Sequence, residues 1–349
     1  MEKKRKVLVG LSGGVDSSVA AYLLLQEGYE VIGVTMQMES AMANKKVIED
    51  AALVAKHLGI THIVLDFHKE FKEHVIQNFI QEYQNGRTPN PCIVCNRNVK
   101  WEALLEKADE LDADYIATGH YATIRKLENQ RYAISNSVTA AKDQTYALYQ
   151  LTQKQLERTL MPVGAYEKDQ IRKMALDALI PVATKADSQE ICFIPDHDYA
   201  AYIERNSDVR LPKEGDFVNT KGEVIGQHKG LIHYTVGQRK GLNLSAGHPV
   251  FVKELKVKEN QVVIGESEDL FTTVLQAYPV HYMGIEKLTE PTRFLAKIRY
   301  GHKGQWCTVT SKEDGSIECV FDEPVRAVTP GQSVVLYQDQ YVALGGVIQ

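Results

Sequence analysis

The first two hundred residues alternate between short apolar runs and segments whose apolar residues recur at helical spacing. Short apolar runs bounded by turn residues predict strands, and apolar positions three and four residues apart predict helices. Strands that alternate with helices predict a parallel sheet covered by helices on both faces, which is the α/β class. The predicted elements are a strand at Val7–Val9, a helix over Val19–Leu24, a strand at Glu30–Met36, a helix at Lys45–Leu58, a strand at Ile60–Asp66, a helix at Phe71–Tyr83, a strand at Asp114–Thr118 and helices at Tyr146–Leu156 and Lys168–Leu179.

The pattern changes near residue 205. Beyond it, short apolar runs are separated by turn signals such as Glu214–Asp216 and Pro330–Gln332, which is typical of all-β structure. We therefore expect an α/β domain over residues 1–205, a small Gly-rich β module over 206–275 and a β-barrel over 276–349. The barrel strands are predicted at Thr292–Arg299, Gln305–Thr310, Ile317–Phe321 and Ser333–Tyr337.

Composition places the chain among ordinary soluble proteins. Its 349 residues are 44% hydrophobic, and the net charge of −5 gives no support to nucleic-acid binding outside local basic patches. The apolar run after the basic segment Met1–Lys6 ends at Ser12, which is too short for a signal peptide, and no stretch approaches a membrane span. Five cysteines in a chain of this length are no disulfide framework, so we expect a cytoplasmic protein without a membrane partner.

The stretch Gly10–Ser18, here called the glycine–serine loop, joins the first predicted strand to the first predicted helix. Gly13 and Gly14 allow a tight turn and let backbone N–H groups approach an anion closely. The helix start behind them favours negative charge. Asp16 suits such a site only when a divalent metal lies between its carboxylate and the anion. The loop therefore predicts a polyphosphate site with a metal at Asp16.

Two common phosphate motifs are excluded at this loop. A Walker loop needs a lysine after its last glycine, and no lysine follows Gly14. A dinucleotide fingerprint needs G-x-G-x-x-G, whereas the glycines here fall at positions 10, 13 and 14. The run S-G-G-V-D-S-S after a strand instead resembles the pyrophosphate loop of the ATP pyrophosphatases, which split ATP between its α and β phosphates.

Three cysteines are candidates for chemistry. Cys92 and Cys95 form a C-x-x-C pair ahead of a predicted helix, whose start favours the thiolate form, and Cys192 lies in the distant segment Asp187–Phe193. A zinc site would need a fourth ligand that the sequence does not supply. A thiol–disulfide couple and an iron–sulfur cluster held by Cys92, Cys95 and Cys192 both remain open, because spacing alone does not separate them.

Five further motifs follow the loop, and with them the chain resembles the bacterial tRNA-specific 2-thiouridylases from end to end. The motifs are T-P-N-P-C-x-x-C-N (Thr88–Asn96), A-T-G-H-Y-A (Ala117–Ala122), K-D-Q (Lys142–Gln144), D-S-Q-E-I-C-F (Asp187–Phe193) and Y-T-V-G-Q-R-K-G-L (Tyr234–Leu242). The resemblance implies a PP-loop fold of the adenine-nucleotide α-hydrolase type and a tRNA substrate. In the implied reaction, ATP with Mg²⁺ adenylates the C2 oxygen of wobble uridine 34, and a persulfide sulfur then replaces that oxygen.

The resemblance also assigns roles to single residues. Cys192 would carry the persulfide, and Cys95 would either attack it to release sulfide or close a disulfide with Cys192 afterwards. The small β module at 206–275 would bind tRNA, and a sulfur-relay protein or a cysteine desulfurase would supply the sulfur. The implied ATP-binding residues are Gly10, Leu11, Ser12, Gly13, Gly14, Val15, Asp16, Ser17, Met36 and Gly119. The implied tRNA-binding residues are Asn90, Pro91, Cys92, His120, Lys142, Asp143, Gln144, Arg299, Tyr300 and Gln332.

Some features keep alternatives open. Many family members have Asp where this chain has Cys92, which weakens an acid–base role there and strengthens the cluster alternative, with sulfide as sulfur source. The segment Gln37–Ala43 is shorter than the loop that many relatives have after the equivalent of Met36. Asp143 also fits a helix start as a cap. Two other functions compete, an amide synthetase of the ATP-pyrophosphatase type and an RNA-binding protein without activity.

Overall fold

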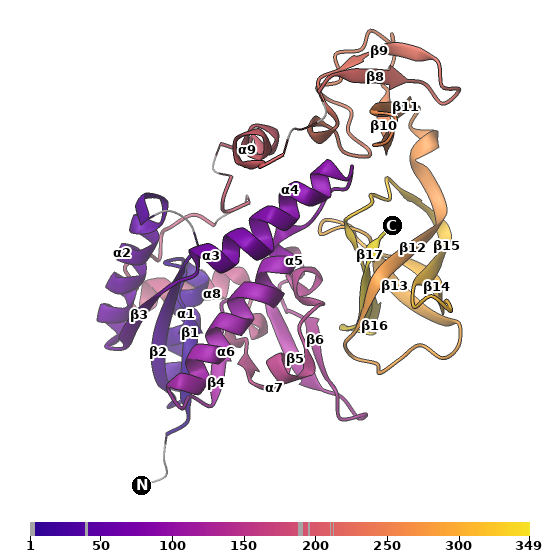
Figure 1. Ribbon diagram of the computed structural model, residues 1–349. Coiled ribbons are helices and arrows are strands. Elements are labelled where there is room, and N and C mark those ends of the chain that lie inside the picture. Colours follow the sequence, from indigo (N-terminus) through magenta and orange to yellow (C-terminus); the bar gives the residue numbers. More distant parts are fainter. Residues whose placement is uncertain (1–3, 39–40, 188–190, 195, 210, 212) are drawn as a thin grey trace.

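The computed structural model describes residues 4–38, 41–187, 191–194, 196–209, 211 and 213–349. Figure 1 shows a helix-covered sheet on one side, a barrel on the other and a small separate sheet above them. Ser188, Gln189 and Glu190 of the D-S-Q-E-I-C-F motif lie outside the described residues, as do Glu39 and Ser40 of the segment after Met36. None of the helices in the described part of the chain has the length and apolar character that crossing a membrane requires.

A five-stranded parallel sheet forms the centre of the first two hundred residues. The strands follow the spatial order β3 (Thr61–Asp66), β2 (Glu30–Gln37), β1 (Lys6–Gly10), β4 (Tyr115–Ala117) and β7 (Thr159–Leu160). Val7, Leu8 and Val9 on the central strand β1 are all fully buried, as expected for a parallel sheet covered on both faces. The predicted α/β class is confirmed.

Helices cover the two faces of this sheet. Val7 and Val9 pack with α1, α2 and α8 on one face, and Leu8 packs with α6 on the other. A second group of helices runs beside α6 and ends near the small sheet (Figure 1). The helices on the faces are α1 (Val15–Gln26), α2 (Ala41–Leu58), α6 (Trp101–Glu110) and α8 (Lys168–Asp177), and the second group consists of α3 (His68–Phe71), the π-helical turn η1 (Lys72–Ile76), α4 (Gln77–Gln84), α5 (Pro91–Cys95) and the π-helical turn η2 (Asn96–Lys100).

The predicted helix over Tyr146–Leu156 is wrong. The segment instead forms a 3₁₀ turn, η4 (Thr145–Leu148), and a separate helix, α7 (Gln153–Glu157). A capping box starts α7 afresh, because the Thr152 hydroxyl accepts from Gln155 N–H and the Gln155 side chain accepts from Thr152 N–H. Tyr146 leaves the helical path and donates its hydroxyl to the Ser333 carbonyl oxygen (2.8 Å) in the barrel.

The last third of the chain forms a closed six-stranded antiparallel barrel, as predicted. The strand order is β12 (Phe271–Tyr282), β15 (Ile317–Arg326), β14 (Gln305–Ser311), β13 (Thr292–Lys297), β16 (Ser333–Gln338) and β17 (Tyr341–Ile348), and β17 closes onto β12. A hairpin from the first part of the chain, β5 (Ala122–Lys126) and β6 (Tyr132–Asn136), extends this sheet through a pairing of Tyr341 with Ser135. Sequence patterning did not predict that hairpin.

The barrel and the parallel sheet share one hydrophobic core. Leu8 and Leu104 from the sheet region belong to the same buried cluster as Met283 and Val335 from the barrel region. This continuous core fixes the barrel against the helix-covered sheet, so loops from both can contribute to one site.

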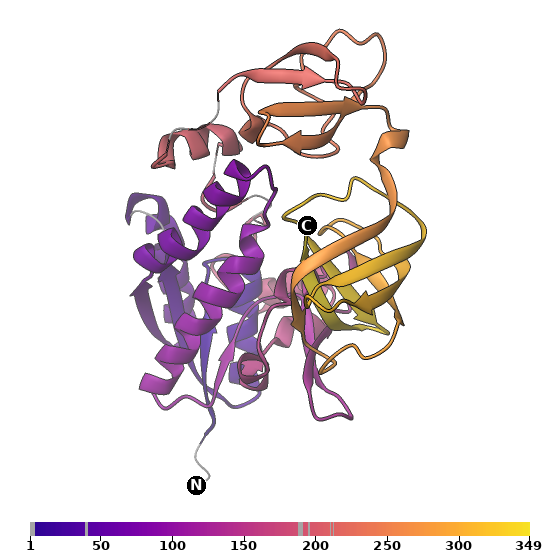
Figure 2. The ribbon, with the colours of Figure 1, turned by 45° about the vertical axis from the view of Figure 1, so that its right-hand side comes forward.

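A smaller sheet stands above both bodies in Figures 1 and 2. It has the order β10 (Phe251–Lys256), β11 (Gln261–Gly265), β8 (Gly215–Val218) and β9 (Val224–His228), and α9 (Tyr199–Asn206) leads into it. Phe217, Tyr234 and Val262 lie in its own small core. Thr88, between α4 and α5, contacts both other bodies: its N–H donates to the Pro330 carbonyl oxygen (2.8 Å), and its hydroxyl to Thr235 Oγ1 (3.2 Å).

Candidate active site

The glycine–serine loop lies between the end of β1 and the start of α1. Gly13 has a φ of +63°, and a Cβ there would come within 2.7 Å of the Val47 carbonyl oxygen, so the turn requires glycine. Gly14 is the N-cap of α1 in an extended conformation, and no side chain caps the helix. The first N–H groups of α1 therefore face outward without a side-chain acceptor, which is an anion-binding geometry.

Hydroxyl groups and a second strand complete the walls of this cradle. Ser12 Oγ lies 3.1 Å from Ser17 Oγ, and Ser12 N–H donates to the same Ser17 oxygen (3.2 Å). Gly119, just after β4, approaches so closely that a Cβ would lie 2.5 Å from Ser17 N. A Cβ on Gly10 would lie 3.9 Å from Met36 Cε. The fold thus brings the predicted ATP-binding residues together, although they come from three separate segments of the chain.

Charged side chains meet beside the cradle. Asp16 accepts hydrogen bonds from the Tyr121 hydroxyl (2.7 Å) and from Lys168 Nζ at both carboxylate oxygens (2.7 and 2.9 Å). Lys168 Nζ also lies 2.9 Å from Asp187 Oδ1. Asp187 in turn pairs with Arg172 (2.9 Å) and, through Oδ2, with Lys142 (3.0 Å).

A further cation reaches the loop from the other side. Lys185 Nζ donates to the Gly13 carbonyl oxygen (2.9 Å) and pairs with Asp50 (2.8 Å), which also pairs with Lys46 (2.6 Å). Hydrogen bonds from these two lysines lower the pKa of Asp50. Sequence reasoning missed Lys168, Arg172 and Lys185, because each is far along the chain from the loop and stands in no recognisable motif.

Cys95 is buried, whereas Cys92 and Cys192 are exposed. Cys95 Sγ lies 4.0 Å from Met38 Sδ, one residue beyond the end of β2, so the thiol is at the same sheet edge as the loop. Burial is the main cause that raises the pKa of Cys95 to about 12, and the nearby Lys100 ammonium opposes that rise. Charge on Cys92 and on Cys192 also acts on Cys95, which means that the three sulfurs share one electrostatic environment.

The three cysteines do not form a metal-binding group. Within the described ranges, no three side chains of His, Cys, Asp or Glu are placed to hold a metal ion. The cluster ligand set Cys92, Cys95 and Cys192 therefore does not fit this arrangement, in which one thiol is buried and two are exposed. We derive no step through a cluster.

Asn90, Pro91 and Cys92 form the start of α5. Asn90 caps that helix, with its side-chain oxygen accepting from Cys92 N–H (3.1 Å), and Pro91 occupies the first turn, where no N–H is needed. Tyr300 comes from the barrel to the same place. Burial chiefly raises its pKa, and the charges of Asp143 and Cys92 add to the effect. Cys92, Asp143 and Tyr300 are thus neighbours.

Several predicted tRNA-contacting residues also have structural partners. Asp143 accepts from Thr145 N–H (3.2 Å) at the start of η4, as the helix-start alternative predicts, and Gln144 accepts from Tyr121 N–H (2.8 Å). Arg299 donates to the Arg326 carbonyl oxygen (2.9 Å), and Gln332 donates to the Thr88 carbonyl oxygen (2.7 Å). Gln332 therefore lies at the junction with α5 and apart from Asp143.

His120 follows β4 and packs against Trp101, with ring centroids 5.5 Å apart. Its Nδ1 lies 2.9 Å from Thr118 Oγ1. Burial, aided by the Lys100 charge, lowers its pKa to about 3, so the ring is neutral at physiological pH.

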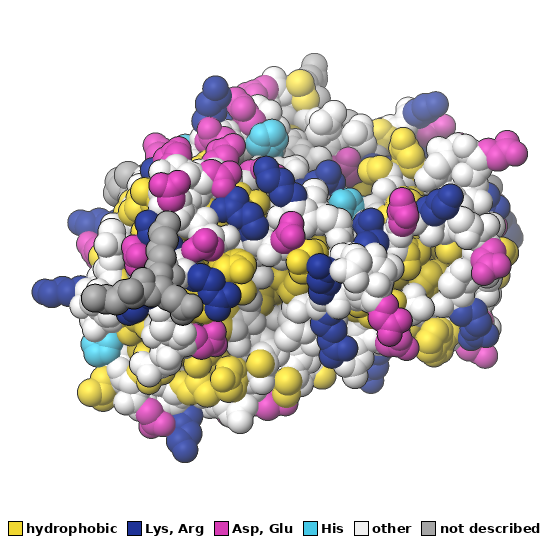
Figure 3. Space-filling view, turned by 90° about the horizontal axis from the view of Figure 1, so that it is seen from below, with side chains coloured by type: hydrophobic (Ala, Val, Ile, Leu, Met, Phe, Trp, Pro, Cys, Tyr) yellow, Lys and Arg dark blue, Asp and Glu magenta, His cyan; other side chains and the backbone are white. Residues whose placement is uncertain are grey.

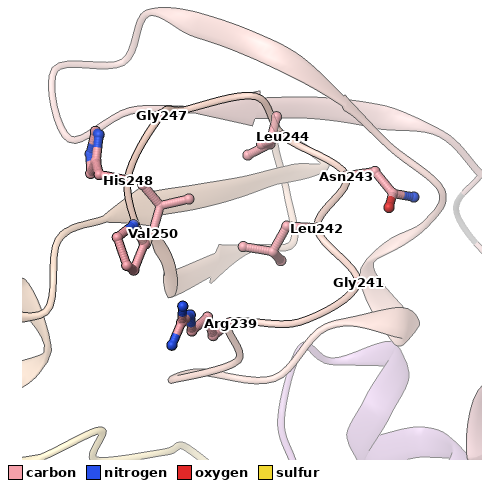
Figure 4. A pocket seen from close by; sticks show the side chains of 9 residues that line it. Arg239, Gly241, Leu242, Asn243, Leu244, Gly247, His248 and Val250 are labelled. Carbon is pink, nitrogen blue, oxygen red and sulfur yellow. The ribbon is translucent and has the colours of Figure 1, made fainter.

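The surface shows no area of a single charge sign on the face in Figure 3, where basic and acidic side chains are interspersed. A pocket of about 400 Å³ lies in the small module and is lined by one loop, residues 239–250 (Figure 4). Arg239 and His248 are its charged or titratable lining residues, and neither belongs to the glycine–serine loop or to the cysteine segments.

Comparison with known proteins identifies the family. The chain is 52% identical over 355 residues to the tRNA-specific 2-thiouridylase MnmA of Lachnoclostridium phytofermentans, a match that covers 99% of both chains. It is 49% identical to the tRNA-specific 2-thiouridylase MnmA of Clostridioides difficile, over 100% of this chain and 99% of that one. This chain belongs to the tRNA-specific 2-thiouridylase family. The resemblance found in the sequence motifs is therefore confirmed, and the protein is a tRNA-modifying sulfurtransferase.

Family models match the 2-thiouridylase chain in three successive parts. The model described as "tRNA methyl transferase HUP domain" matches residues 5–196, "tRNA methyl transferase PRC-barrel domain" matches 207–266 and "Aminomethyltransferase beta-barrel domain" matches 272–348. Among solved structures, "U34-tRNA thiolase NcsA from Methanococcus maripaludis with its [4Fe-4S] cluster" matches 58% of this chain and 67% of that chain, at 19% identity and a TM-score of 0.36.

Proposed function

We propose that this 2-thiouridylase replaces the C2 oxygen of wobble uridine 34 in tRNA by sulfur, at the expense of ATP. One observation carries the proposal. The glycine–serine loop follows β1, Met38 beside Cys95 follows β2, and His120 follows β4, so the anion cradle and the sulfur groups lie at one carboxyl edge of the sheet. Ligands of open parallel sheets bind at that edge.

The cradle fits the phosphates of ATP. The uncapped N–H groups at the start of α1 and the hydroxyls of Ser12 and Ser17 would donate to phosphate oxygens, with Met36 and Gly119 beside the adenosine. Mg²⁺ also fits, because nucleotide-bound Mg²⁺ takes one or two carboxylates plus phosphates and waters, and Asp16 offers such a carboxylate. When bound, Mg²⁺ would neutralise phosphate charge during transfer.

In the first step, the uridine O2 attacks the α-phosphorus, the O2–P bond forms, and pyrophosphate leaves with the electrons of the broken P–O bond. In the second step, the outer sulfur of a Cys192 persulfide attacks C2, and AMP leaves with the C2–O bond electrons. Cys95 then attacks the inner sulfur, which breaks the persulfide S–S bond and leaves a Cys95–Cys192 disulfide that a cellular dithiol must reduce. Alternatively, Cys95 attacks first and releases sulfide as the nucleophile.

The tRNA would contact residues near Cys92, where Asn90, Asp143 and Tyr300 gather. Because C2 is inaccessible in a stacked anticodon, the base must be turned out of the stack to reach the sulfur. The small module is proposed to bind tRNA, and a sulfur-relay protein or a cysteine desulfurase to load Cys192. The reaction is proposed to take place in the cytoplasm.

The steps separate in a Cys192→Ser variant. With unmodified tRNA and ATP, this variant should still release pyrophosphate, because adenylation needs no thiol, but it should form no 2-thiouridine. A variant that still thiolates would assign the sulfur chemistry elsewhere. Transfer of ammonia instead of sulfur by Cys192→Ser would point to an amide synthetase.

Cys92→Ala and an iron assay test the cluster alternative. The persulfide route predicts that anaerobically purified enzyme thiolates tRNA without iron or acid-labile sulfide, and that Cys92→Ala keeps part of its activity. Activity that requires bound iron and is abolished in Cys92→Ala would replace the persulfide route by cluster chemistry.

A further inference from the structure

Lys168 pairs with two carboxylates that come from distant parts of the chain. Its Nζ lies 2.7 and 2.9 Å from the oxygens of Asp16 in the glycine–serine loop, and 2.9 Å from Asp187 Oδ1. Only 11% of the Lys168 side chain is exposed, so solvent screens these contacts weakly. We call this arrangement the Lys168 bridge.

Asp187 depends on the Lys168 bridge more than its number of partners suggests. Its other partners, Lys142 and Arg172, have side chains that are 42% and 36% exposed, and ion pairs in such positions contribute little. Burial is the largest influence on the pKa of Asp187 and raises it, but hydrogen bonds from Lys168 and Lys142 lower it overall. The buried lysine is therefore the main anchor of this carboxylate.

Asp187 fixes one end of the stretch that carries Cys192, five residues further along the chain. The other end is fixed by Phe193, whose buried ring packs against Phe71 and Phe79 with centroids 5.6 and 5.4 Å apart. Cys192 therefore stands beside a firm hydrophobic anchor on one side, and its stretch is held on the other side by an electrostatic anchor.

A polyphosphate in the glycine–serine loop would compete for this electrostatic anchor. The loop has no lysine of its own, and the nearest ammonium group on Asp16 is that of Lys168. Several phosphate charges beside Asp16 attract Lys168 more strongly than the single charge of Asp187 does. When Lys168 turns to the phosphates, Asp187 keeps only its two screened partners.

We propose that Lys168 is a positioning residue that couples nucleotide occupancy of the loop to the placement of the Cys192 stretch. The bridge holds this stretch while the loop is empty and loosens it when polyphosphate binds. The sulfur carrier is thus freed after ATP has arrived to activate the base. This inference rests on the proposed function, in which ATP binds the loop and Cys192 carries the sulfur.

The test measures the rate at which iodoacetamide alkylates Cys192, quantified by peptide mass spectrometry, without and with saturating α,β-methylene-ATP and Mg²⁺. In the wild-type enzyme we expect the nucleotide to raise the rate about threefold or more, the size expected when one partly screened ion pair is lost. Asp187→Asn should be alkylated at the faster rate in both conditions. Lys168→Gln should show the faster rate without nucleotide, from the other side of the bridge.

Asp196→Asn is the matched control. Asp196 lies four residues beyond Cys192 and pairs with Arg205 (3.2 Å), outside the bridge, so this variant should respond to nucleotide like the wild type. Calorimetric titration confirms saturation, and circular dichroism confirms folding of each variant. An alkylation rate that does not change with bound nucleotide in the wild type, or a wild-type response in folded Asp187→Asn, would overturn the coupling.

Thiolation of tRNA by the wild-type enzyme, measured in parallel, separates the two proposals. If the alkylation response is present and thiolation is absent, the coupling stands and the proposed function fails. If thiolation is present and the response is absent, the function stands and the coupling is wrong.

Discussion

Single atoms decide what fits between β4 and the first turn of α1. In Gly119→Ala the new Cβ would lie 2.5 Å from Ser17 N and 2.7 Å from the Asp16 carbonyl carbon, so the helix start must shift. Overpacking of this kind costs about 1–3 kcal/mol, and we expect ATP to bind at least about tenfold more weakly. Gly301→Ala, where a Cβ meets nothing within 4 Å, is the control. Equal ATP affinities of the two variants by calorimetry would contradict the cradle.

His120 makes stability depend on pH. The unfolded chain protonates this residue near pH 6.5, whereas the folded protein, in which burial lowers the pKa to about 3, does not. Its contribution is therefore complete above pH 6.5 and is lost as the pH falls toward 3. In His120→Gln, urea midpoints should fall less steeply between pH 7 and pH 5, by up to about 1.4 kcal/mol per pH unit. Parallel pH profiles would show that His120 is protonated in the folded state.

Residues within a motif were predictable from the sequence, and residues between motifs were not. The turn and the helix start around Gly13 and Gly14 follow from local chemistry, and the structure has both. Lys168 stands 152 positions from Asp16, and nothing in its local sequence distinguishes it from a surface lysine at a helix start. Such pairs are created by the tertiary fold alone.

At the scale of elements, caps decide where helices begin. Thr152→Ala removes one half of the capping box of α7, in which Thr152 Oγ1 accepts from Gln155 N–H (3.3 Å). We expect a loss of about 0.5–2 kcal/mol in the free energy of unfolding, measured by urea titration. Lys154→Ala, an exposed position in the same helix, should change stability little. A smaller loss for Thr152→Ala than for Lys154→Ala would contradict this role.

Elements with a clear period were predicted, and those shaped by partners were not. The parallel strands and four barrel strands appear at the expected places, because their apolar runs are buried on the sheet they build. The apolar residues of 146–156 suggested a helix, yet Tyr146 and Tyr149 are apolar-facing because they pack into the barrel. The hairpin β5–β6 is short and takes its partner from β17, more than two hundred residues away.

At the scale of the whole molecule, the sheet region and the barrel share a core. Met283 is fully buried there, and its sulfur accepts from Ile134 N–H (3.3 Å) of the hairpin. Met283→Ala should cost about 2–5 kcal/mol. Hydrogen exchange should rise both in β5–β6 and in the barrel strands beside it, whereas Val320→Ala, 44% exposed on β15, should leave both unchanged. Faster exchange confined to the barrel would show that the two bodies are energetically separate.

The central claim is that this chain thiolates tRNA at C2 of uridine 34. The most direct measurement incubates iron-free enzyme with unmodified tRNA, ATP, Mg²⁺ and a persulfide donor, and analyses the digested nucleosides by mass spectrometry. We predict 2-thiouridine at position 34, with one AMP and one pyrophosphate for each sulfur incorporated, and none when ATP is omitted. Persulfide-loaded enzyme that releases AMP but leaves every uridine unmodified would contradict the account.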